Sequence, residues 1–355
     1  MPQKCILIGA SAGGLEPLRE VVAQLPADLP APVFVVMHLP ANHKSYLPDI
    51  LSNTGPLPAL HPEDKARIAA GSIYVAPPDH HLLIDDGSVA VKRGPKENGF
   101  RPSIDALFRS AAYSYGPGAI GVVLSGALND GTSGLWSIKR LGGIAIVQEP
   151  DQARYPSMPR SALEYVDADY QVHSSEIGPL LTQLTQEQPT QEEMAGHGMD
   201  EDLRRLAIET QLAAGVNVPE KTVLELGSLT QFTCPECKGS LIRIAEGGSF
   251  RFRCHTGHGF TADALLAELM KTIDAQLWQT IRGLQEASML LEHIGRHMQE
   301  NGGSAQAEVF LAKARELNQQ SSQFQRTAVG NESLSAATMQ QQEPIDGQSH
   351  AETED

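Results

Sequence analysis

The chain has 355 residues, of which 41% are hydrophobic, and its formal net charge at pH 7 is −16. This length suits two or three domains with a sizeable core, and the excess of acid argues against nucleic acid and anionic membrane surfaces as partners. No apolar run approaches the roughly 20 residues of a membrane-spanning helix, so we expect no membrane insertion. We see no signal peptide ahead of the first strand, and three of the four cysteines form one local cluster. We therefore expect a cytoplasmic protein.

A strand, a turn and a helix open the chain. The apolar run Cys5–Gly9 predicts a buried strand, and Gly9-Ala-Ser11-Ala-Gly13 then has the form Gly-x-Ser-x-Gly. Such a turn lifts a serine hydroxyl above the end of a sheet, close to backbone N–H groups at the start of a helix. We expect this helix to begin near Ser11, which makes Ser11 a candidate nucleophile.

The same turn has two other interpretations. Ser11 could simply cap the helix that follows it. A dinucleotide-binding turn is disfavoured, because Ser11 stands where such a turn needs its second glycine. In addition, the next strand ends in His38 and not in an acidic residue that would bind a ribose.

Strand and helix patterns alternate up to about residue 185, which predicts a doubly wound, mostly parallel α/β sheet with helices on both faces. A hairpin at 81–84 and 89–92 interrupts the alternation. Helices are expected to begin near Ser11, Lys44, Ser103, Gly131 and Pro159. The expected strands are Cys5–Gly9, Val33–His38, Ser72–Ala76, Ile120–Ser125, Ile144–Gln148 and Tyr170–His173.

A nucleophilic serine needs a base within reach and a third group that orients the base. His38 ends the strand expected beside the first one, so its imidazole can reach Ser11, with His43 in the following loop as a competitor. Asp130 lies at the tip of the Gly-rich turn after Ile120–Ser125. Its alternative role is to cap the following helix. The carboxyl ends of parallel strands meet at one edge of a sheet, so a Ser11–His38–Asp130 triad is predicted there.

Several segments together resemble the catalytic domain of the CheB-type chemotaxis protein-glutamate methylesterases, over Cys5 to about Val172. The segments that carry the resemblance are Ile8–Gly14, Val35–His38, Ile73–Pro78, Arg101–Asp105, Leu124–Gly131 and Met158–Arg160. The resemblance implies a serine hydrolase without a catalytic cofactor. Its substrates would be methyl esters on glutamate side chains of chemoreceptor cytoplasmic helices, and glutamine side chains for deamidation.

The resemblance also implies a role for each site residue. Ser11 would be the nucleophile, His38 the general base and then acid, and Asp130 the orienting carboxylate, with the backbone N–H groups of Ala12 and Ala127 holding the oxyanion. The family usually has threonine where Ala12 stands and methionine where Ala127 stands. Well-known members carry a phospho-accepting receiver domain ahead of this domain. The catalytic strand opens this chain, so we expect no control in cis through such a domain.

A second motif combines Cys234-Pro-Glu-Cys237 with Cys254-His-Thr-Gly-His258. Three cysteines and one histidine suit a closed, tetrahedral structural zinc site, for which we expect Cys234, Cys237, Cys254 and His258. His255 is the rival fourth ligand. The alternative is a small metal-free β unit with buried thiols.

A long helix is expected from Thr261 to Glu300 and a second from Gln306 to about Phe324, which could pair with each other, with a partner or with a second copy. Plain core packing is the alternative. The domains predicted are 1–185 catalytic, 186–229 acidic linker, 230–262 zinc-ribbon-like, 263–329 helical hairpin or coiled coil, and 330–355 disordered. An idle signalling adaptor that recruits partners through the zinc unit and the arm is the alternative to the enzyme.

Overall fold

A computed structural model of the chain describes residues 3–39, 41, 43–187, 199–302 and 304–330. The chain divides into two compact units, the first ending at Leu265 and the second beginning at Leu266. None of the described helices has both the length and the apolarity that crossing a bilayer requires. The predicted tail 330–355 lies outside the described residues except for Gly330, and so do residues 188–198 of the predicted acidic linker 186–229.

The first unit is built on a seven-stranded sheet with the strand order β3-β4-β2-β1-β7-β8-β9. Every pair of neighbours in it is parallel, which confirms the predicted fold class. The two-residue strand β3 was not predicted from the sequence. The strands are β1 (Cys5–Ala10), β2 (Val33–Met37), β3 (Ala59–Leu60), β4 (Ile73–Val75), β7 (Ala119–Val123), β8 (Ile144–Gln148) and β9 (Tyr170–Val172).

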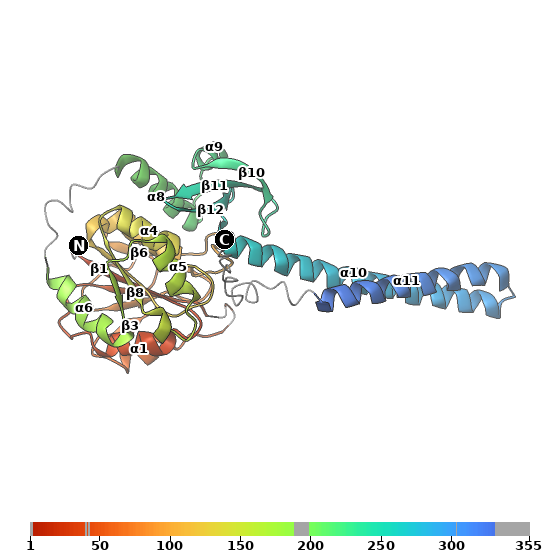
Figure 1. Cartoon of the computed structure of the whole chain (residues 1–355), viewed down its shortest axis with the longest axis horizontal. Coiled ribbons are helices and arrows are strands. Elements are labelled where there is room, and N and C mark those ends of the chain that lie inside the picture. Colours follow the sequence, from red (N-terminus) through yellow and green to blue (C-terminus); the bar gives the residue numbers. More distant parts are fainter. Residues whose placement is uncertain (1–2, 40, 42, 188–198, 303, 331–355) are drawn as a thin grey trace, which may run out of the picture. The chain divides into compact units, whose positions relative to one another are not determined.

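Helices cover both faces of this sheet (Figure 1). Successive side chains of β1 point to opposite faces of the sheet and so pack against different helices. Cys5 and Leu7 pack with α3, α4 and α5, whereas Ile6 and Ile8 pack with α1, α2 and α6. Helix α6 was not predicted. The helices are α1 (Leu15–Ala23), α2 (Leu47–Ser52), α3 (Ile104–Tyr115), α4 (Thr132–Arg140), α5 (Ser157–Tyr165) and α6 (Ser174–Gln186), with short 3-10 turns at Gly116–Gly118 and Pro150–Gln152.

The remaining strands form two antiparallel pieces. The predicted hairpin is present as β5 (His81–Asp85) and β6 (Ser88–Lys92). The cysteine-rich segment folds into a four-stranded sheet, preceded by helices α8 (Met199–Ala213) and α9 (Glu220–Leu224). Its strands are β10 (Ser228–Thr233), β11 (Ser240–Glu246), β12 (Ser249–Cys254) and β13 (Gly259–Thr261). We call residues 228–261 the Cys/His unit.

Buried ion pairs join the Cys/His unit to the parallel-sheet domain. Arg253 of β12 pairs with Glu97 at 3.0 Å and with Glu209 of α8 at 3.0 Å, and all three are buried. Arg109 of α3 also pairs with Glu97, and Arg251 pairs with Glu209. A buried pair that loses one partner leaves an uncompensated charge, so these contacts fix where the Cys/His unit lies within the first compact unit.

In the second unit, the helix α10 (Ala262–Glu300) continues from the first unit and pairs with α11 (Ser304–Gly330) in a hairpin. The buried positions of α11 are small residues seven apart, Ala307, Ala314, Ser321 and Ala328. The facing row of α10 contains Ser288, whose hydroxyl donates to the Ala314 carbonyl at 2.9 Å. Among the large apolar residues of α10, Ile281 is buried, whereas Ile273 is 43% exposed. Small residues let two helices approach closely, so periodicity of large apolar residues does not reveal this seam.

Candidate active site

Ser11 follows the carboxyl end of β1. Its backbone N–H donates to the Ser125 carbonyl beyond β7 at 3.0 Å, which fixes it between two parallel strands. Helix α1 begins at Leu15, later than the predicted start near Ser11. Gly13 explains the difference, because its φ of +68° takes the chain out of helical geometry. A side chain at Gly13 would also come within 2.9 Å of the Tyr155 ring.

His38 follows β2, the strand beside β1. Its Nδ1 lies 3.0 Å from the Ser11 hydroxyl oxygen, and its backbone N–H donates to the Ala10 carbonyl. The imidazole lies flat against the ring of Phe100, with centroids 3.8 Å apart and planes 7° apart. His43, the rival base, is exposed. The structure therefore brings His38 to Ser11, as predicted from the strand ends.

Asp130 follows β7 and completes the row of three side chains. His38 Nε2 donates to one Asp130 carboxylate oxygen at 2.9 Å, and the backbone N–H of Ile104 donates to the same oxygen at 2.7 Å. The other oxygen accepts from Asn98, Ser103 and the N–H of Asp105. With Nε2 protonated in this way, Nδ1 carries the free lone pair that faces the Ser11 hydroxyl.

These donors set the charge of Asp130. Burial alone would raise the pKa of this carboxyl, but the hydrogen bond and charge of His38 and the donors from Ile104 and Asn98 outweigh burial. They hold the pKa of Asp130 well below its usual range. Asp130 is therefore an anion at neutral pH, which is the state that stabilises an imidazolium.

A second buried carboxylate, Asp105, lies behind Asp130. It accepts the N–H groups of Gly131 and Gly134 at 3.0 and 2.7 Å and so caps the start of α4. Burial and the charge of Asp130 raise the pKa of Asp105 well above its usual value. The sequence assigned helix capping to Asp130 as an alternative role, whereas Asp105 caps α4 and Asp130 accepts N–H groups at the start of α3.

Two backbone N–H groups remain available near Ser11. Among the residues that the structure describes, neither the N–H of Ala12 nor that of Ala127 has a hydrogen-bond acceptor. The turn that holds Ala127 is constrained, since Leu128 has a φ of +62° and a side chain at Gly126 would overlap Met158. Such φ values in residues other than glycine cost energy and gather at functional sites. Both N–H groups are free to bind an oxyanion.

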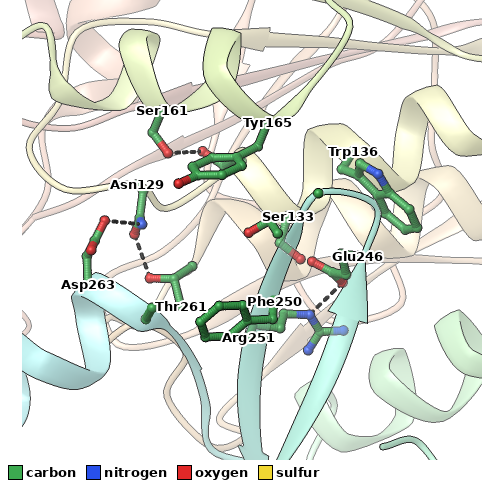
Figure 2. Close-up of a pocket in the computed structure, with 14 residues that line it drawn as sticks. Asn129, Ser133, Trp136, Ser161, Tyr165, Glu246, Phe250, Arg251, Thr261 and Asp263 are labelled. Atoms are coloured by element: carbon green, nitrogen blue, oxygen red, sulfur yellow. Dashed lines mark hydrogen bonds and ion pairs between the residues drawn. The ribbon is translucent and has the colours of Figure 1, made fainter.

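Behind the turn that carries Asp130 lies a cavity of about 150 Å³ (Figure 2). In Figure 2 the Asn129 amide points toward Thr261 and Asp263, to which it is hydrogen bonded at 2.6 and 2.9 Å. Trp136, Tyr165 and Phe250 supply aromatic walls. Within the described part of the chain, the residues that line this cavity do not include Ser11 or His38. It is thus a separate feature between α4, α5 and the Cys/His unit.

The predicted metal ligands also lie together. The ligand atoms of Cys234, Cys237, Cys254 and His258 are all within 4.8 Å of one another. The Sγ atoms of Cys237 and Cys254 are 3.6 Å apart, and Cys254 Sγ lies 3.5 Å from His258 Nδ1. A tetrahedral ion with metal–sulfur bonds of about 2.3 Å requires sulfur–sulfur separations of about 3.8 Å. The donor set and its spacing therefore fit zinc.

The rival ligand His255 is not part of this group of four. Its ring lies against Gly239, where a side chain would come within 2.7 Å of it. The hydroxyl of Thr256 instead lies 3.2 Å from Cys237 Sγ and 3.0 Å from Cys254 Sγ. The Thr256 hydroxyl is thus a polar neighbour of the cysteine sulfurs, and the sequence pattern did not indicate it.

A parallel α/β sheet with a hydrogen-bonded Ser–His–Asp row at its strand ends defines a candidate serine hydrolase. Comparisons with known proteins show to which family of hydrolases the chain belongs. A profile of the CheB methylesterase family matches residues 6–181. A relative from Leptospira interrogans is 38% identical over 187 residues, which are 52% of this chain and 97% of the relative. This relative is named as a protein-glutamate methylesterase/protein-glutamine glutaminase, and its name marks the assignment as provisional. The chain therefore belongs to the CheB methylesterase family.

Two further matches also cover about half of this chain. Protein-glutamate methylesterase/protein-glutamine glutaminase 3 of Anaeromyxobacter dehalogenans is 40% identical over 161 residues, which cover 45% of this chain and 47% of that protein. The crystal structure of the Thermotoga maritima CheB methylesterase catalytic domain is 33% identical. It covers 51% of this chain and 98% of that one, with a TM-score of 0.49. The Cys/His unit and the helical hairpin lie beyond the residues that the family profile matches.

Proposed function

We propose that this chain is a protein-glutamate methylesterase with Ser11, His38 and Asp130 as its catalytic residues. The observation that carries the proposal is the continuous hydrogen-bonded row from Ser11 through His38 to Asp130, at 3.0 and 2.9 Å. Family membership supplies the reaction, since the named relatives are methylesterases and glutaminases. Those names favour the enzyme over an idle adaptor.

The reaction proceeds in two halves. The Ser11 oxygen attacks the ester carbonyl while Nδ1 of His38 takes the hydroxyl proton, and Asp130 stabilises the resulting imidazolium. The N–H groups of Ala12 and Ala127 bind the oxyanion. The tetrahedral intermediate then collapses, and methanol leaves with the proton from His38. A water molecule, deprotonated by His38, attacks the glutamyl-enzyme and releases a free carboxylate and Ser11. With a glutamine side chain, ammonia replaces methanol.

The substrate class is tested by methanol release. Methylated cytoplasmic fragments of chemoreceptors are incubated with the full chain, and methanol is measured over time. The proposal predicts release by the wild-type chain and none above background by Ser11→Ala. If the wild-type chain is active on small esters but releases no methanol from any methylated receptor, the substrate assignment is wrong and the hydrolase assignment stands.

We also propose that Cys234, Cys237, Cys254 and His258 bind one structural zinc ion. Four protein ligands leave no position open for substrate, so the ion holds the fold and takes no part in the hydrolysis. The free, closely spaced thiols support this. The cytoplasmic location, the domain boundaries and a partner for the helical hairpin remain predictions from the sequence.

A further inference from the structure

The loop that follows β6 contacts two members of the proposed triad. Phe100 stacks on His38, and the side chain of Asn98 donates to Asp130 at 2.9 Å. Asn98 is buried, and its φ of +54° is one that asparagine tolerates better than most residues. The loop therefore contacts both the base and the acid of the proposed triad.

The amide of Asn98 can point only one way. Its nitrogen donates to two carboxylates, Asp105 and Asp130, each at 2.9 Å. Its oxygen accepts the backbone N–H of Thr261 at 2.8 Å. Flipping the amide would place its oxygen against the Asp130 carboxylate and its NH₂ against the N–H of Thr261. The three contacts together specify the position of this side chain.

Thr261 belongs to β13, the last strand of the Cys/His unit. The backbone of Asn98 also donates to the Gly259 carbonyl of the same strand at 2.8 Å. Next to Asp130, the amide oxygen of Asn129 accepts the Thr261 hydroxyl at 2.6 Å (Figure 2). Strand β13 thus contacts two residues that adjoin the acid of the triad: Asn98, which donates to Asp130, and Asn129, which precedes Asp130 in the chain.

The buried ion pairs hold this strand against the loop. Glu97 precedes Asn98 and pairs with Arg253 of β12, the neighbour of β13. Arg109 of α3 reaches the same carboxylate. A shift of the Cys/His unit would have to break these buried pairs. The pairs therefore keep β13 within hydrogen-bonding distance of Asn98.

We infer that Asn98 is a positioning residue that fixes the carboxylate of Asp130 toward His38, and that β13 of the Cys/His unit fixes Asn98. The inference rests on the proposed function of Ser11, His38 and Asp130. It assigns to residues beyond the family match a part in building the catalytic site. Without this donor, the Asp130 oxygen that faces away from His38 keeps only the Ser103 hydroxyl and the N–H of Asp105, so we expect the carboxylate to orient the imidazole less well.

The test is a double-mutant cycle on the full chain, read as the rate at which a fluorophosphonate labels Ser11. Asn98→Gly removes the amide without backbone strain. Asn98→Asp is nearly isosteric and keeps an acceptor for Thr261, but it replaces the donor to Asp130 with an oxygen that faces Asp130 and Asp105. Asn217→Gly, at an exposed site, is the matched control. Each variant is also placed in an Asp130→Asn background, and unfolding midpoints confirm that all are folded at the assay temperature.

Because a hydrogen bond to a charged group is lost, both Asn98 variants should label roughly 10- to 100-fold more slowly than wild type. On a methyl ester, kcat should fall with KM nearly unchanged, and Asn217→Gly should match wild type. In the Asp130→Asn background the Asn98 variants should cause no further loss, because the residue acts through Asp130. Labelling of both Asn98 variants at the wild-type rate, or an equal loss in both backgrounds, overturns the inference. Failure of the wild-type chain to label at Ser11 would instead count against the proposed function.

Discussion

The ring of Phe100 lies parallel to the imidazole of His38 at a centroid distance of 3.8 Å. This contact holds the plane of the ring whose two nitrogens face Ser11 and Asp130. Aromatic stacking contributes about 0.5–1.5 kcal/mol beyond burial, so Phe100→Ala should lower kcat by roughly 2- to 12-fold. Tyr113→Ala, at an exposed aromatic residue of α3, is the control and should retain full activity. A Phe100→Ala enzyme with unchanged kcat would show that the stacking does not orient the base.

Replacing the acid of the triad should be far more damaging. Asp130→Asn preserves the shape, but it removes the negative charge and presents an amide to His38 and to the surrounding N–H donors. We expect kcat to fall about 10³- to 10⁴-fold, as for other triads of this kind. Asp105→Asn is the comparison, since Asp105 caps α4 and does not contact His38. Asp105→Asn should mainly lower the free energy of unfolding, measured in urea. Its kcat for ester hydrolysis should fall much less than that of Asp130→Asn. Similar kcat losses in the two variants would contradict the assigned roles.

The sequence predicted Ser11, His38 and Asp130 because each ends a buried strand, and parallel strands place such residues at one edge. Asn98 and Phe100 were missed because they lie in an aperiodic loop, whose contacts depend on a β-strand 160 or so residues away in sequence. Likewise, acid-rich composition predicts a linker over 186–229, yet Glu209 within this stretch is buried between Arg251 and Arg253. Charge composition does not distinguish a solvated acid from one paired inside the fold. The catalytic roles themselves stay predictions.

The buried carboxylates also predict how stability depends on pH. Burial opposes ionisation of Glu97, but the charges of Arg109 and Arg253 outweigh it and lower its pKa from 4.5 to about 2. A carboxyl with a lowered pKa in the folded chain stabilises the fold above its unfolded pKa and loses that effect as the pH falls through the folded pKa. The free energy of unfolding should therefore fall between about pH 4.5 and pH 2, by on the order of 3 kcal/mol from Glu97.

Urea unfolding at pH 7, 4 and 3 tests this dependence. Glu16→Gln, at an exposed helix position, should follow the wild-type profile. Glu97→Gln should be less stable at pH 7, because it leaves Arg253 and Arg109 underpaired, and should lose less on acidification. An identical acid dependence in wild type and Glu97→Gln would show that this carboxyl is not a source of it.

Metal removal should affect the hydrolase site through β13, which directly follows His258. Metal analysis of the purified chain should find about one zinc per chain, with loss in Cys254→Ser and retention in Cys5→Ala, a buried thiol outside the cluster. Chelation should slow fluorophosphonate labelling of Ser11, and added zinc should restore it. A purified chain without zinc would contradict the zinc proposal. A chain that labels equally fast after chelation would contradict the link between the zinc site and the triad.

The site of covalent labelling tests most directly whether Ser11 is the nucleophile. The full chain and Ser11→Ala are treated with a fluorophosphonate and digested, and the modified peptide is identified by mass spectrometry. We predict one phosphonyl group on Ser11, a labelling rate that falls sharply in His38→Ala, and no label in Ser11→Ala. Label on another residue, or none on the wild-type chain, would contradict a nucleophilic Ser11 activated by His38 and Asp130.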